Sequence, residues 1–210
     1  MTFWHGFMII TVVHLLAAAS PGPDFIFVTR QSLLFGRRAG LLASLGIALG
    51  LSIHIAYSAA GLVTVVAHSA KWMMMIRVGG GSYLIYLGVK GLLSGKSSQT
   101  FAPQAKLTST TSASRQIMMG FLCNALNPKA PIYFLALFTI VLSPDMPVFE
   151  LVVYGIWLML LQLLWFSFIA TAFTHGALRE RLLGARHWID RVFGAALVAL
   201  GLRVLASHQK

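Results

Sequence analysis

Charged residues are scarce in this chain of 210 residues. They make up 10% of the sequence, whereas apolar residues make up 58% and the mean hydropathy is +0.80. Soluble domains contain about 25% charged residues, so this composition excludes a soluble fold of one or two domains. Intrinsic disorder is excluded as well, because a chain this apolar would not stay solvated.

Cysteine and acidic residues are nearly absent too. The single Cys123 excludes an intrachain disulfide, a CxxC redox pair and a cysteine-based zinc site. The chain contains only five acidic residues but 16 Lys and Arg, which gives a formal net charge of +11. In a soluble protein that charge would suggest nucleic acid. Here the basic residues lie in particular connections, so they indicate orientation in a membrane, and no nucleic-acid partner is expected.

Long apolar runs take the place of the missing charges. A run of about 18 or more uncharged apolar residues is typical of a membrane span. The six segments are Phe3–Leu34, Ala39–Val66, Trp72–Leu93, Gln116–Leu142, Pro147–Phe173 and Trp188–Ala206. No Lys or Arg precedes the first one, so we expect a retained span rather than a signal peptide. The predicted fold class is an all-α integral membrane protein with six transmembrane helices.

Basic residues gather on alternate connections between these segments. Eight lie on the first, third and fifth connections: Arg37, Arg38, Lys96, Lys106, Arg115, Arg179, Arg181 and Arg186. The opposite side carries two, Lys71 and Lys210. Positively charged loops stay in the cytoplasm, so both termini are expected on the outer, periplasmic side.

The third connection divides the chain into two halves of three segments. Residues 94–115 contain ten Ser or Thr and no acid, which is typical of a flexible linker. Because three is odd, residues 116–210 must be inverted relative to residues 1–93. A constant offset relates Gly81, Leu84, Leu87, Gly88 and Lys90 to Gly194, Leu197, Leu200, Gly201 and Arg203. We therefore predict two inverted three-helix repeats with broken first and fourth helices.

The first break lies at residues 20–24. Pro21 and Pro23 donate no backbone hydrogen bond, and Gly22 adds conformational freedom. One unbroken helix here would be about 48 Å long, against ~30 Å of hydrocarbon. Asp24 is an intramembrane carboxylate and therefore a candidate for substrate binding or coupling. The alternative is that Asp24 caps the helix that begins near Phe25.

The second break lies near residues 124–131. Asn124, Asn127, Pro128 and Lys129 interrupt an apolar run there, and Asn offers both donors and acceptors. Lys129 either faces Asp24 or a substrate carboxylate, or extends its ammonium to the cytoplasmic surface. His14 and His54 lie in the first two segments, where they are candidates for a proton relay or are hydrogen-bonded interior side chains. Two His without clustered carboxylates make a poor metal site, so no metal is expected.

At these residues the chain resembles the lysine and threonine exporter family (LysE/RhtB). The resemblance rests on Ser20-Pro21-Gly22-Pro23-Asp24-Phe25, on Gly36-Arg37-Arg38-Ala39-Gly40, on Gly46-Ile47-Ala48-Leu49-Gly50 and on Asn124 with Asn127-Pro128-Lys129. It covers essentially the whole chain, and the Pro-Gly-Pro-Asp form is most similar to the threonine-exporter branch. The resemblance implies efflux of amino acids from the bacterial cytoplasm, driven by the proton-motive force.

The predicted function is secondary active export of small neutral amino acids, threonine, homoserine or related ones, by proton antiport across the bacterial inner membrane. An ion or metal permease or channel of similar size is the alternative, but its acidic rings or His/Cys clusters are not visible in the sequence. A membrane enzyme or assembly subunit would also fit the composition, but no enzymatic activity and no cofactor are expected. The partners are the amino-acid substrate and the lipid bilayer, and a homo-oligomer stays open.

Overall fold

The structure is a computed structural model that describes residues 2–20, 22–68, 70–93, 112–127, 129–130, 134, 137, 141 and 146–206. The described residues form helices and no strands, which confirms the all-α fold class. The helices are α1 (Phe3–Ala19), α2 (Pro23–Phe35), α3 (Arg37–His68), α4 (Ala70–Leu92), α5 (Ala113–Ala125), α7 (Val148–Thr174) and α8 (Gly176–Ala206). Pro21, Pro128 and most of the linker 94–115 lie outside the described residues.

Two of these helices are long and apolar enough to cross a membrane. They are α3 over Arg37–Ser58, with a mean hydropathy of 1.9, and α7 over Val148–Thr174, with a mean hydropathy of 2.0. Helices α1 and α2 together form a third candidate span that is bent by 60° at residues 20–22. The length and hydropathy of these helices indicate a membrane protein, with two or three candidate spans among the described residues.

The bend between α1 and α2 follows from the local sequence. The backbone N–H of Ser20 donates the last bond of α1, to the Leu16 carbonyl at 3.2 Å, and Ser20 itself is extended. Gly22 is the N-cap of α2, and Pro23 occupies the first helical position. Proline suits that position because its missing N–H would have no partner there and its fixed φ is already helical. The chain therefore restarts a helix at Pro23 in a new direction.

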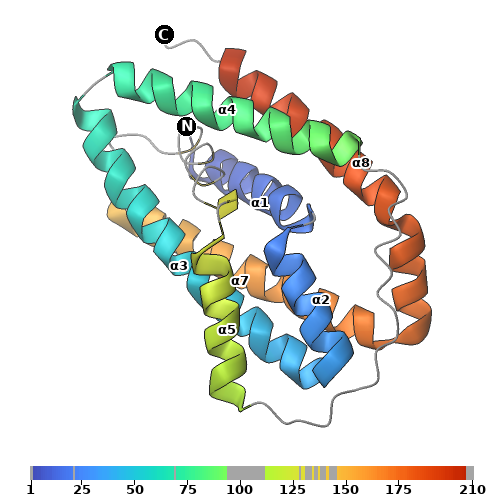
Figure 1. Cartoon of the computed structure of the whole chain (residues 1–210). Coiled ribbons are helices and arrows are strands. Elements are labelled where there is room, and N and C mark those ends of the chain that lie inside the picture. The colour runs from blue at the N-terminus through green and yellow to red at the C-terminus, as the bar shows by residue number, and fades with distance from the viewer. Residues whose placement is uncertain are drawn as a thin grey trace.

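Helix α7 lies at the centre of the packing and touches both halves of the broken span. Its N-terminal part joins a core with α1 and with described residues of 130–141, where Ile10, Phe134, Tyr154 and Leu158 are fully buried or nearly so. Its C-terminal part packs Phe166 and other side chains against α2 and α3. In Figure 1, α2 crosses in front of α7 and α1 lies above it, and both helices contact α7.

Helices α3 and α5 approach each other along glycines. A Cβ atom on Gly46 would overlap the Ile117 carbonyl oxygen, and one on Gly120 would overlap the Ala43 carbonyl oxygen. A Cβ atom on Gly50 would lie 2.7 Å from the Phe121 carbonyl oxygen. Because these glycines have no side chain, the two backbones can come into contact, which fixes the end of α5 against the middle of α3.

Helices α4 and α8 form a separate layer, with the C-terminal part of α8 lying along α4 (Figure 1). Leu84, Leu197 and Val204 form its buried core. Residues 179–186, expected in the fifth connection between spans, are helical, because α8 begins at Gly176 and runs through them. This segment consists mainly of Leu, Arg, Glu and Ala and contains no proline, so a helix can continue through it.

Candidate functional site

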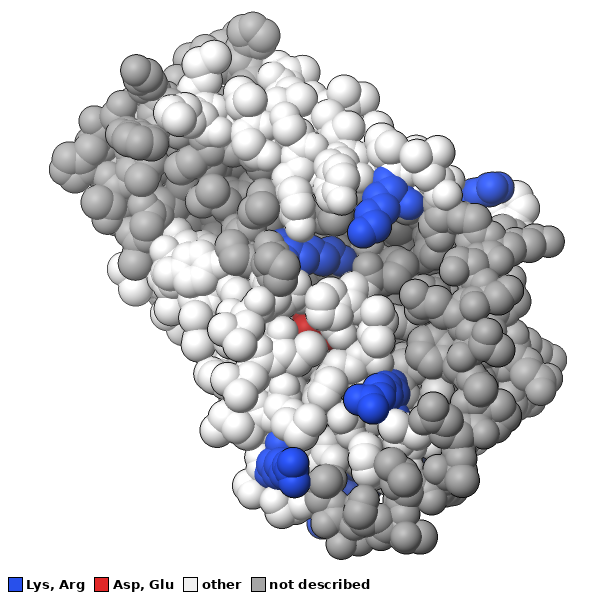
Figure 2. Space-filling view, in the orientation of Figure 1, with Lys and Arg blue, Asp and Glu red and all other residues white. Residues whose placement is uncertain are grey.

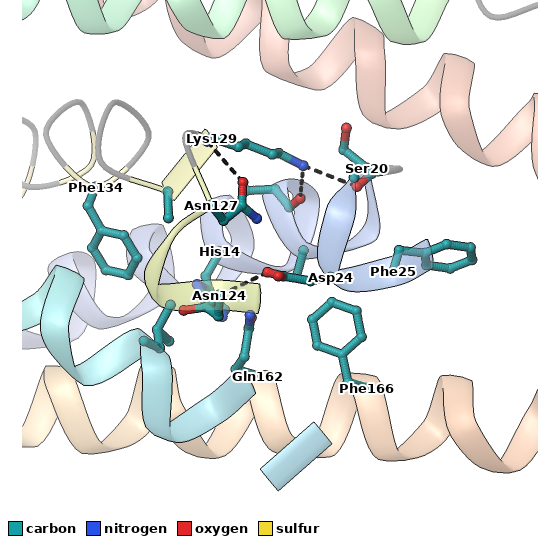
Figure 3. Close-up of a pocket in the computed structure, with 15 residues that line it drawn as sticks. His14, Ser20, Asp24, Phe25, Asn124, Asn127, Lys129, Phe134, Gln162 and Phe166 are labelled. Atoms are coloured by element: carbon teal, nitrogen blue, oxygen red, sulfur yellow. Dashed lines mark hydrogen bonds between the residues drawn. The ribbon is translucent and has the colours of Figure 1, made fainter. Parts of the chain in front are cut away.

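A small polar pocket lies where the broken span meets the end of α5 and the middle of α7. Its cavity volume is about 40 Å³, room for about three waters at ~10–15 Å³ each. The polar side chains that line it are His14, Ser20, Asp24, Asn124, Asn127, Lys129 and Gln162. They come from both halves of the sequence and converge in Figure 3. On the face shown in Figure 2, a small acidic area lies in a depression near basic side chains.

Asp24 occupies the centre of this pocket and is 8% exposed. One carboxylate oxygen accepts a hydrogen bond from the Asn124 side-chain amide at 2.8 Å, and the other accepts one from the Cys123 thiol at 3.5 Å. The N-cap of α2 is Gly22, which makes no side-chain cap bond, so Asp24 is the second residue of the helix rather than its cap. Its carboxylate is held instead by the chain's second half.

Lys129 closes the opposite side of the pocket. Its ammonium donates hydrogen bonds to the carbonyl oxygens of Ala17, at 2.7 Å, and Ser20, at 3.1 Å (Figure 3). These carbonyls lie at the C-terminal end of α1, where the helix leaves its last four carbonyls without intrahelical partners. Lys129 therefore satisfies backbone acceptors that the bend sets free, and it also complements the negative end of the α1 dipole.

The two asparagines shape the end of α5 in different ways. Asn127 accepts the backbone N–H of Lys129 on its side-chain oxygen at 3.0 Å, which forms a tight turn after the helix. Asn124 is 1% exposed and donates its side-chain amide N–H to Asp24, while its buried side-chain oxygen has no hydrogen-bond partner among the described residues. Buried acceptors of this kind are rare, so a ligand that donates a proton to this oxygen would be stabilised.

The two histidines have different positions. His14 is 2% exposed, lines the pocket and interacts with Gln162. His54 is 1% exposed and lies behind the lining, against the backbone of Asn124. The sequence prediction missed Gln162, although this residue lies in the middle of the apolar helix α7 and an intramembrane polar residue is a signal in itself.

The remaining sequence-predicted residues differ in their position relative to the pocket. Gly22 lines it, with the Lys129 side chain 3.6 Å from a Cβ built on the glycine. Pro23 is exposed and does not line it. Pro21 and Pro128 lie outside the described residues. Within the described part of the chain, no three His, Cys, Asp or Glu gather closely enough to hold a metal ion.

Apolar membrane-length helices, one of them broken around a buried carboxylate and ammonium, are the architecture of a membrane transporter. The particular family follows from comparison with known sequences, because the LysE type translocator family matches residues 15–208. The chain belongs to this family. It is accordingly a membrane transporter and not an enzyme.

Membrane proteins of several bacteria are similar to most of the chain. The threonine efflux protein of Escherichia coli (strain K12) is 30% identical over 96% of this chain and 98% of its own length. The threonine efflux protein of Salmonella typhi is 29% identical over the same shares. A membrane protein of Bacillus subtilis (strain 168), YrhP, is 27% identical over 87% of this chain and 90% of its own. No solved structure matches the chain.

Proposed function

We propose that this protein exports small neutral amino acids, threonine, homoserine or related ones, from the bacterial cytoplasm in exchange for protons. The observation that carries the proposal is the pocket at the bend, where a buried carboxylate and an ammonium face one small cavity. Similarity to threonine efflux proteins over 96% of the chain supports the same substrate class.

The pocket complements both charges of a zwitterion. The substrate ammonium is expected on Asp24 and on the unpartnered side-chain oxygen of Asn124. The substrate carboxylate is expected at the N-terminus of α2, whose first N–H groups have no side-chain cap and carry the positive end of the dipole. Lys129 adds a donor there, since an ammonium has three N–H bonds and two already reach carbonyls.

Competition for one carboxylate provides the coupling. Asp24 can hold a proton or the substrate ammonium, but hardly both, because protonation removes the negative charge that binds the ammonium. The loaded site would move outward and the protonated site would return, which makes exchange obligatory.

We also propose that the chain forms six membrane spans in two inverted repeats, residues 1–93 and 116–210, which are joined by the linker 94–115. The sequence matches pair Gly81 with Gly194 and Gly88 with Gly201. A Cβ on Gly201 would lie 2.7 Å from the Gly81 carbonyl oxygen, and one on Gly88 would lie 2.5 Å from that of Gly194. A twofold axis that exchanges the matched glycines turns one contact into the other, as an inverted repeat requires.

Orientation follows from charge. The first, third and fifth connections carry the basic residues, so they are proposed to face the cytoplasm, and both termini are proposed to face the periplasm.

Replacement of Asp24 by Asn tests the proposal. Asparagine keeps the shape of the side chain but cannot exchange a proton, so Asp24→Asn should reach the membrane and yet lose uphill efflux. The measurement is the retention of labelled threonine by cells with and without an uncoupler. Glu150→Gln is the matched control, because Glu150 lies in the first turn of α7 and outside the pocket lining. Uphill export at the normal rate by Asp24→Asn cells would show that another residue couples transport.

A further inference from the structure

His54 links three parts of the protein around the pocket without lining it. The ring lies in the middle of α3, its Nε2 atom is 2.8 Å from the backbone carbonyl oxygen of Asn124, and its Nδ1 atom is 2.8 Å from the Tyr57 hydroxyl. Its plane is stacked on Phe134 at 15°, with the ring centroids 6.1 Å apart. Phe134 in turn forms part of the pocket wall.

These contacts determine which nitrogen carries the proton. A carbonyl oxygen only accepts, so Nε2 of His54 must donate to Asn124. In the neutral ring Nδ1 is then the acceptor, and the Tyr57 hydroxyl donates to it. Tyr57 therefore selects the tautomer that can hold the Asn124 carbonyl, in the way that outer partners orient histidine ligands elsewhere.

The Asn124 carbonyl is also where α5 ends. It accepts the backbone N–H of Asn127 at 2.9 Å, at the point where the helix stops at Ala125. The side chain of the same Asn124 holds Asp24. A shift of this carbonyl would move both the amide that fixes the carboxylate and the unpartnered oxygen beside it.

We propose that His54 is a positioning residue, which holds the end of α5 through the Asn124 carbonyl and the pocket wall through Phe134. It sets the affinity of the pocket and does not itself exchange protons with the pocket. This role deepens the proposed function and uses the same site. It also assigns Tyr57 as the residue that fixes the ring's tautomer.

The test compares four variants of the full-length protein in proteoliposomes that contain labelled threonine. His54→Leu removes the donor and should raise the half-saturating threonine concentration by about threefold to tenfold, the effect of one neutral hydrogen bond. Its maximal rate should stay within about twofold of wild type, since Asp24 still exchanges protons. His54→Gln keeps an N–H donor and should restore most of the affinity. Tyr57→Phe should raise the half-saturating concentration, whereas Tyr86→Phe, on the exposed face of α4, should not.

Alkylation of Cys123 by N-ethylmaleimide supplies a second readout that needs no substrate. Cys123 directly precedes Asn124 and contacts Asp24, so a loosened end of α5 should expose its thiol. We expect faster alkylation in His54→Leu and Tyr57→Phe, and a rate close to wild type in His54→Gln and Tyr86→Phe. Because this measurement does not depend on threonine, it tests His54 even if wild type moves no threonine and the proposed function fails.

Two results would overturn the proposal. One is an unchanged half-saturating concentration and alkylation rate in Tyr57→Phe, a variant that removes a single hydroxyl and remains informative if His54→Leu does not fold. The other is a loss of proton-driven accumulation in His54→Gln with normal threonine affinity, which would make His54 a proton relay instead.

Discussion

Removal of the Lys129 ammonium should destabilise the bend itself, apart from any effect on transport. In Lys129→Met the side chain keeps its length but loses both hydrogen bonds, to the Ala17 carbonyl at 2.7 Å and to the Ser20 carbonyl at 3.1 Å. Each buried acceptor left without a partner costs about 1–3 kcal/mol, so the two together cost about 2–6 kcal/mol. Methionine also removes the desolvation penalty of the charge, so we expect about 2 kcal/mol net, at the lower end of this range.

The assay is thermal unfolding of the purified protein in detergent, followed by size-exclusion fluorescence. At this chain length 1 kcal/mol corresponds to about 2–4 °C, so the midpoint of Lys129→Met should fall by about 4–8 °C. Lys129→Arg retains N–H donors and should lose less. Lys90→Met is the matched control. Lys90 is exposed on α4, so this variant should unfold at the same temperature as wild type. A Lys129→Met midpoint equal to that of Lys90→Met would refute the argument that the ammonium holds the end of α1.

Two further predictions concern packing and topology. Gly46→Ala should sharply reduce the yield of folded protein, because its Cβ would overlap the Ile117 carbonyl oxygen. Gly79→Ala is the control and should fold normally, since a Cβ there would meet no atom within 4 Å. Gel filtration of both variants measures the folded yield, and a well-folded Gly46→Ala would contradict the close contact of α3 with α5. In a cysteine-free background, a cysteine at Ser98 should be protected from impermeant reagents in intact cells and one at Asp145 should react. Labelling at Ser98 from outside would reverse the proposed orientation.

The break in the first span could be read from the sequence because its cause is local. Two prolines and a glycine within a long apolar segment interrupt the hydrogen bonds of a helix wherever they occur, and α1 and α2 meet there. Residues 179–186, which the sequence places in a connection between spans, are helical for the related reason that charge alone does not end a helix. That segment lacks proline, so α8 continues through its arginines.

The partners within the pocket could not be read from the sequence. The sequence left open whether Lys129 faces Asp24, a substrate carboxylate or the cytoplasmic surface. In the structure Lys129 is bonded to carbonyls, and Asp24 is bonded to an amide and a thiol. Gln162 and Phe134 carry no local signal that would bring them to this place. Their contribution depends on how α7 and Phe134 pack across the bend.

The sequence by itself determined the membrane class, the all-helical fold, the positions of both breaks and the residue types that interrupt the apolar segments, because hydrophobicity and backbone hydrogen bonding act within each segment. Only the tertiary structure decided which interrupted ends meet and which donor satisfies which acceptor. The Asn124 amide reaches Asp24 across 100 residues of chain, and the Lys129 ammonium reaches Ala17 across 112. Such pairings are set by close helix packing, as at Gly46 and Gly120, and no local pattern in the chain encodes them.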